Sequence, residues 1–137
     1  MVPLCFEALE DEGATIALGY WNNNTMEEID IPDSVSFVCS TDDQTTWKDY
    51  DGYAVDLKKG DKVYIKAKTI NDNLVVDGNK FAFFKMIGGK VAASGNINTL
   101  LNPRPNARIS LNGKNYCYSY LFGRRTYDEN WNNVPCC

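Results

Sequence analysis

Short runs of alternating apolar and polar residues, separated by turn-forming residues, are the feature that most limits the folds open to this chain. The clearest run covers residues 62–68, in which Val63, Ile65 and Ala67 alternate with lysine and tyrosine. Successive side chains of a strand point to opposite faces of its sheet. The run therefore predicts a strand with one buried face and one basic face.

Six other segments show similar patterns and are predicted as strands: residues 4–9, 15–20, 35–40, 53–57, 81–87 and 90–97. Turn-forming residues such as Asp11-Glu12-Gly13 and Asp77-Gly78-Asn79 separate them. Seven short strands with these separators are typical of an all-β fold, and we predict an antiparallel β-sandwich. The predicted core residues are Val63, Ile65, Trp47, Phe37 and Phe83.

The composition of the chain changes after Leu101. The segment Asn102-Pro103-Arg104-Pro105-Asn106 suits neither a strand nor a helix and is predicted to be a linker. We therefore expect a β-sandwich domain over residues 1–102, followed by a linker and a short C-terminal appendage over residues 103–137. A chain of 137 residues buries about two-thirds of the surface that its unfolded form exposes, so this core does not require disulfides.

Acidic and basic residues are unevenly distributed along the chain, whose net charge is -4. Residues 1–56 contain thirteen Asp and Glu and one lysine, whereas residues 57–137 contain five acids and thirteen Lys and Arg. In one interpretation the halves interleave and their charges pair across strands; in the other, two poles pack head to tail against copies of the chain or a scaffold. The second interpretation gives these candidate contacts: Glu27, Glu28 and Asp30 on one side, and Lys66, Lys68, Arg124 and Arg125 on the other. The negative net charge argues against nucleic-acid binding.

Catalysis is not expected, because the chain has no histidine and no recognisable pairing of a nucleophile with a base. We predict that the protein is not an enzyme and requires no cofactor or metal. Residues 71–79 are rich in Asn and Asp, but their spacing differs from that of an EF-hand loop and favours an ordinary loop between strands.

The five cysteines include no CxxC pair. Cys5 and Cys39 lie in apolar runs and are predicted to be buried. Cys136 and Cys137 are predicted to be a frayed pair of terminal thiols, the alternative being reactive thiols or a bridge to another chain. This set fits a reducing compartment. The longest apolar runs are far shorter than the roughly 20 residues needed to cross a bilayer, so no membrane insertion is predicted.

Residues 40–47, Ser-Thr-Asp-Asp-Gln-Thr-Thr-Trp, match the S-x-D-x-G-x-T-W spacing of an Asp-box, except that Gln44 replaces glycine. In this motif the aspartate caps a turn through backbone N–H groups while the tryptophan packs beneath it. We therefore predict a structural hairpin and not a ligand site.

Several aromatic residues lie near basic residues and form a candidate interaction surface. Aromatic rings of this kind stack on sugars or bases, although most are expected to pack in a core or interface. The candidate surface comprises Trp21, Trp131, Tyr120, Arg124, Arg125, Glu27 and Glu28. A carbohydrate-binding module is therefore one of the alternative functions.

Several ordered segments resemble a domain found in surface proteins of gut Bacteroidetes and in their bacteriophages, crAss-like or related. Residues 3–10 resemble its opening "PLTFEA", residues 40–47 its "STDGxTTW" hairpin, residues 59–67 its "GDKVYFRA" strand and residues 91–101 its "AASGNIMSLL" close. Residues 115–122 are similar to the "NYCYYxLF" start of BspA-type leucine-rich repeats, here truncated after the first unit.

The resemblance implies an Ig-like β-sandwich used as a noncatalytic surface module. The domain follows the initiator Met without an export signal, and its cysteines suit assembly in a reducing host cytoplasm. We therefore expect a bacteriophage virion surface protein, a capsid decoration or fibre subunit, whose partners are other virion proteins or copies of itself. The same-fold alternative is a bacterial cell-surface adhesion module that contacts a host glycan or protein.

Overall fold

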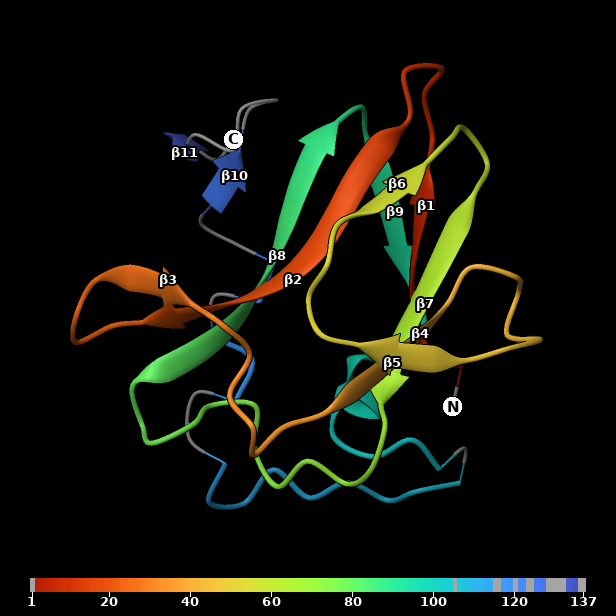
Figure 1. The fold of residues 1–137 in the computed structure, drawn as a ribbon. Helices are drawn as coiled ribbons and strands as arrows, with labels where there is room; N and C mark the ends of the chain where they lie inside the picture. The colour runs from red at the N-terminus through yellow and green to blue at the C-terminus, as the bar shows by residue number, and fades with distance from the viewer. Residues whose placement is uncertain are drawn as a thin grey trace.

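Two antiparallel sheets form the body of the protein in the computed structural model, which describes residues 2–104, 106–114, 117–119, 121–122, 125–127 and 133–135 (Figure 1). The all-β, antiparallel, sandwich-like fold predicted from the sequence is confirmed. The elements are β1 Leu4–Ala8, β2 Ala14–Asn22, β3 Glu27–Ile29, β4 Phe37–Ser40, β5 Lys48–Tyr50, β6 Val55–Leu57, β7 Lys62–Ala67, β8 Lys80–Gly88, β9 Val91–Ser94, the 3-10 helix η1 Ile97–Leu100, β10 Arg125–Tyr127 and β11 Asn133–Pro135.

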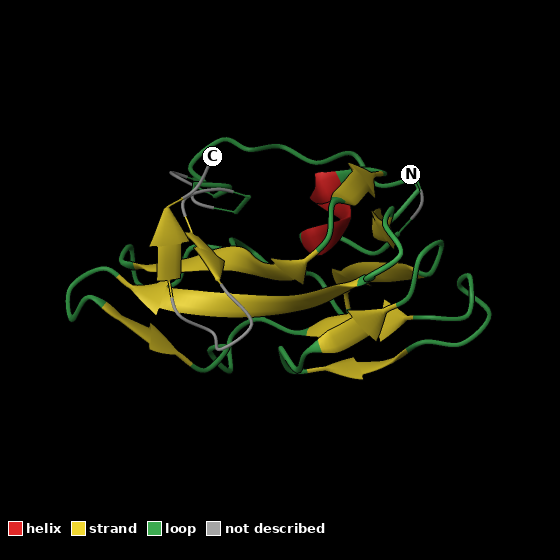
Figure 2. Cartoon of the chain, turned by 90° about the horizontal axis from the view of Figure 1, so that it is seen from above, coloured by secondary structure: helices red, strands yellow, loops and turns green. Residues whose placement is uncertain are grey.

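The first sheet has the strand order β5-β4-β7-β1-β9. In the second sheet β2 is central: β8 pairs along its whole length, and the short strands β3 and β6 pair with its two ends. Because β8 occupies one edge of β2, β3 and β6 share the other edge. The helix η1 follows β9 and lies near the N-terminus (Figure 2). In the part of the chain that the structure describes, no helix has the length and apolarity of a membrane span.

Alternate residues of the strands fill the core between the sheets. Val63 and Ile65 of β7 are fully buried and Phe37 of β4 is buried, as predicted. Phe83 is also buried, but Ala82 and Phe84 are the β8 residues that belong to the main core cluster. The period of two therefore places Phe83 on the outer face of its sheet, opposite Gly19 of β2.

Trp47 is only half-buried, so its assignment to the core is wrong. Its ring lies under the Lys66 ammonium, with the nitrogen 4.1 Å from the ring centroid. Lys66 belongs to the polar face of β7, so the hairpin carries Trp47 to the outside of the sheet. Cys5 and Cys39 are buried, as predicted, and Cys136 and Cys137 lie outside the described residues.

Part of the C-terminal appendage belongs to the core of the sandwich. Cys117 and Leu121 are buried in the same hydrophobic cluster as the strands. The Phe84 N–H donates a hydrogen bond to the Leu121 carbonyl at 2.9 Å, and the Phe122 ring stacks on Phe84 with centroids 5.9 Å apart. Further along, the β10–β11 hairpin begins close to β8 (Figure 1). The described residues Cys117, Leu121 and Phe122 therefore pack as part of the sandwich.

Candidate functional site

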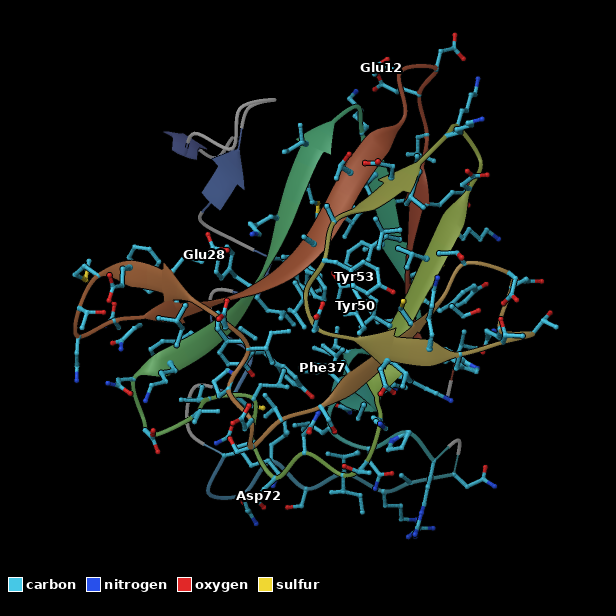
Figure 3. The ribbon with its side chains drawn as sticks, in the orientation of Figure 1. Glu12, Glu28, Phe37, Tyr50, Tyr53 and Asp72 are labelled. Carbon is cyan, nitrogen blue, oxygen red and sulfur yellow. The ribbon has the colours of Figure 1, made fainter. Side chains whose placement is uncertain are left out.

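A cleft of about 580 Å³ opens between the loop before β4 and the loop after β5. Figure 3 shows Phe37, Tyr50 and Tyr53 close together at its position. Phe37 and Tyr50 are register partners on neighbouring strands, and the rings of Tyr50 and Tyr53 meet edge to face with centroids 4.7 Å apart. The lining residues are Asp30, Ile31, Pro32, Asp33, Val35, Ser36, Phe37, Asp49, Tyr50, Asp51, Tyr53 and Lys68.

Tyr50 anchors the wall formed by the loop after β5. Its hydroxyl accepts the Leu18 N–H at 2.9 Å and donates to the Tyr53 carbonyl at 2.8 Å. This one group therefore ties the loop to the middle of β2 in the other sheet. Burial raises the pKa of Tyr50 well above its ordinary value, so the hydroxyl stays protonated and keeps its role as a donor.

Gly52 allows the same loop to approach β2 closely. Its φ of 96° lies in the left-handed region, and a Cβ at this position would sit 2.6 Å from the Leu18 carbonyl oxygen and 3.2 Å from Ile31 Cδ1. Ile31 belongs to the opposite wall. The two walls therefore meet β2 at a point where only glycine fits without rearrangement.

Asn71 anchors the second wall. Its side-chain oxygen accepts the Ser36 N–H at 3.0 Å, and its side-chain nitrogen donates to the carbonyls of Ser36 at 3.1 Å and Leu100 at 2.8 Å. The Asn71 side chain is almost completely buried. Three backbone groups, two of Ser36 and one of the distant Leu100, thus depend on one amide, which fixes the loop that carries Asp33 and Val35.

The rim of the cleft is acidic. Among its lining residues, Asp30, Asp33, Asp49 and Asp51 face one cation, Lys68, whose ammonium lies 2.9 Å from Asp49. Tyr53 is 40% exposed, and its hydroxyl lies 3.0 Å from the Cys39 sulfur. Burial, followed by the Cys39 contact, raises the pKa of Tyr53 to about 12, so the ring is neutral at physiological pH. The cleft thus combines carboxylates with one accessible aromatic ring.

The structure brings together only part of the interaction surface predicted from the sequence. Trp21 of β2 is half-buried and pairs in register with Glu28 of β3, while Glu27 is exposed beside it. Glu28 forms an ion pair with Lys85 at 2.5 Å. The backbone of Arg125 begins β10, and Tyr120, Arg124 and Trp131 lie outside the described residues. Trp21, Glu27 and Glu28, the members of this set whose side chains the structure describes, do not line the cleft.

Opposite charges from the two halves of the chain pair across the fold, as the first of the two charge interpretations predicted. Four ion pairs in the described residues join an acid of residues 1–56 to a base of residues 57–137: Glu7–Lys62, Asp11–Lys59, Glu28–Lys85 and Asp49–Lys68. Glu28 and Lys68, two of the contacts expected between head-to-tail copies, are thus already paired within the chain.

The Asp-box forms the structural hairpin that was predicted. Ser40 Oγ donates a hydrogen bond to Asp42 at 2.8 Å and accepts the Gln44 N–H at 2.9 Å. The Asp42 carboxylate also accepts hydrogen bonds from the Thr46 N–H, at 2.9 Å, and from the Thr46 hydroxyl. Gln44 adopts a left-handed φ of 68°, the conformation that glycine at this position of the motif would adopt more readily.

Replacing Gln44 by glycine is expected to stabilise the protein by about 0.5–1 kcal/mol. A residue with a side chain is strained in the left-handed region, and glycine is not. Urea unfolding followed by tryptophan fluorescence measures the change. Gln44→Ala is the matched control: it removes the same side chain but keeps the Cβ, so it should not stabilise. Equal stabilisation by both variants would contradict this explanation.

The hydrogen bonds of the hairpin also predict acid sensitivity. Donation from the Thr46 hydroxyl, then from the Thr46 N–H and Ser40, lowers the pKa of Asp42 from 3.8 to about 2. A lowered pKa contributes stability above the unfolded value of 3.8, and this contribution is lost as the pH falls toward 2. Carboxyl-carbon NMR should show that Asp42 titrates near pH 2 in the wild-type protein. In the Thr46→Val variant the midpoint should move toward 3.8, and an unchanged midpoint would contradict the assignment of the lowered pKa to the Thr46 hydroxyl.

The Asn-rich loop after β7 uses several of its polar groups within the protein, although the buried Asn79 Oδ1 has no hydrogen-bond partner among the described residues. Asn71 binds Ser36, Asn73 accepts the Val75 N–H at 3.0 Å, and Asp77 pairs with Lys80 at 2.7 Å. Across the described residues, no three Cys, Asp or Glu side chains gather closely enough to hold a metal ion.

Comparison with protein-family models, curated proteins and solved structures finds no match to this chain. The cleft is therefore interpreted from its own geometry. The signal for it in the sequence is weak: Asp30, Asp33, Asp51 and Tyr53 lie in turn segments that also suit plain connections between strands.

Proposed function

We propose that this protein is a noncatalytic interaction module on the surface of a bacteriophage virion, as a capsid decoration or fibre subunit. The resemblance of several segments, which cover most of residues 3–122, to domains of Bacteroidetes surface proteins and their phages suggests this role. The observation that carries the proposal is that the residues behind the resemblance build the framework of the sandwich. Such residues build a scaffold that presents a binding surface. The partners of the protein are then other virion proteins or further copies of this chain.

Two of these segments lie far apart in the sequence and lock together in the fold. The Leu4 N–H of β1 donates to Thr99 Oγ1 of η1 at 3.2 Å, and the Asn96 N–H donates to the Val2 carbonyl at 2.9 Å. Between them Gly95, with a φ of 82°, approaches the Pro3 carbonyl so closely that a Cβ would clash with it. The opening and closing segments therefore act as one structural unit.

The other segments also have structural roles. Residues 40–47 form the hairpin whose Trp47 lies against Lys66 of β7. From the last segment, Leu121 enters the core and Phe122 packs on Phe84. With these residues committed to the fold, the acidic cleft is the surface that we assign to partner binding.

A bacterial cell-surface adhesion module is the same-fold alternative. A carbohydrate-binding module is the second candidate function, and the observation that favours it is Tyr53, an exposed ring beside carboxylates in the cleft. Aromatic rings with neighbouring hydrogen-bonding groups suit sugar binding.

Mass spectrometry of purified virions and of host membrane fractions tests the proposal. Stoichiometric copies in virions are the expected result, and recovery only in the host envelope would overturn it in favour of the adhesion module. A glycan array with wild-type, Tyr53→Ala and Trp21→Ala proteins tests the carbohydrate alternative. Glycan binding that Tyr53→Ala abolishes would replace the proposed partner class with a carbohydrate.

A further inference from the structure

We propose that the acidic cleft binds the cationic side chain of a lysine or arginine presented by a partner protein. This inference deepens the proposed function and relies on it only for the presence of a partner. It rests on three features of the cleft: the charge of its rim, the apolar surface within it and the fixed position of its walls.

The rim carries more carboxylates than the described part of the chain neutralises. Lys68 pairs with Asp49, whereas Asp30, Asp33 and Asp51 form no ion pair with any other described residue. The Lys68–Asp49 pair shows that a lysine ammonium reaches this rim with a nitrogen-oxygen distance of 2.9 Å. A second cation from outside would face the remaining carboxylates.

The interior of the cleft suits the alkyl stem of such a side chain. Ile31 and Pro32 are half-buried along the cleft and offer apolar surface, while Val35 and Phe37 belong to the core cluster and close its floor. Lysine and arginine bury their methylene groups on apolar surface while their charged ends stay with polar partners. A small inorganic cation would gain nothing from this surface, so the composition favours an organic cation.

Tyr53 offers a further contact for the charged group. Its ring is neutral and 40% exposed, and an aromatic face attracts lysine and arginine. The same protein already contains this interaction, where the Lys66 ammonium lies over the Trp47 ring.

The walls are fixed before a partner arrives. Tyr50 holds one loop to Leu18, and Asn71 holds the other through both backbone groups of Ser36. A site that is already ordered loses less conformational entropy on binding. Exposed charge pairs are individually weak, so a single side chain would bind with about millimolar affinity, and repeated copies on a particle would act together.

The test uses the full-length, 15N-labelled protein and the peptide acetyl-Gly-Lys-Gly-amide, titrated by NMR. We expect shift changes confined to amides of residues 30–37 and 49–53. The same peptide with Nε-acetyllysine keeps the stem but loses the charge, and it should bind at least tenfold more weakly. Equal binding of both peptides, or shifts located elsewhere, would overturn the proposal.

The double variant Asp33→Asn/Asp51→Asn should also bind the lysine peptide at least tenfold more weakly. Its matched control, Asp11→Asn/Glu12→Gln, removes the same charge at the exposed β1–β2 turn, where Figure 3 shows Glu12. The control should bind the peptide like the wild type. Loss of binding in both variants would mean that net charge alone causes the effect, and it would contradict a specific site in the cleft.

A measurement on the wild-type protein covers the case in which the double variant does not fold. Raising NaCl from 20 to 500 mM should weaken lysine-peptide binding at least tenfold, because salt screens exposed charges. Salt-independent binding would overturn the proposal. These results do not depend on where the protein resides, so failure of the cleft and failure of the virion assignment are distinguishable.

Discussion

Asn71→Ala is expected to lower the free energy of unfolding by about 3–5 kcal/mol. The substitution leaves the Ser36 N–H and the carbonyls of Ser36 and Leu100 without their partner, and each buried unpaired group costs about 1–3 kcal/mol. Urea unfolding at pH 7 measures the loss. Because Ser36 lines the cleft, the variant should also change the amide shifts of residues 30–37.

The control for this variant is Asn24→Ala, at an exposed turn position. Its stability should change by less than about 0.5 kcal/mol. A loss below about 1 kcal/mol for Asn71→Ala would show that water or backbone movement replaces the amide, and that the wall carrying Asp33 is not fixed by it.

Leu121→Ala is the second large effect, with an expected loss of about 2–5 kcal/mol. Leu121 is fully buried in the cluster formed by the two sheets, so the substitution removes apolar contacts and leaves a cavity. Leu111→Ala is the matched control from the same appendage, since Leu111 is 46% exposed, and it should cost less than about 0.5 kcal/mol. Similar small losses for both would mean that the appendage does not share the core.

The sequence predicts strands well where a period of two extends over several residues. All seven predicted segments contain strands, and the burial of Val63 and Ile65 follows directly from the alternation. The strands β3, β5, β10 and β11 were not predicted. Each has three residues, as in Glu27-Glu28-Ile29 of β3, and is too short to show a period. Pairing with β2 creates β3, pairing with β4 creates β5, and β10 and β11 pair with each other.

The cleft depends on contacts that no local pattern contains. The loops around Asp33 and Asp51 meet because β4 and β5 pair in one register, and because Asn71 from a distant loop binds Ser36. Trp47 shows the same limit, since its aromatic character suggests burial whereas the hairpin places it outside. The apolar residues near Leu121 indicate burial but not that β8 is their neighbour.

Carbodiimide cross-linking of purified virions tests the central claim most directly, namely that a partner contacts this protein through the acidic cleft. The reagent joins a carboxylate to a lysine amine with loss of water, so only groups in contact react. We predict that mass spectrometry finds Asp30, Asp33 or Asp51 joined to a lysine of another virion protein or of a second copy. Intermolecular links only from other acids, such as Asp11 and Glu12 of the β1–β2 turn, would contradict the account.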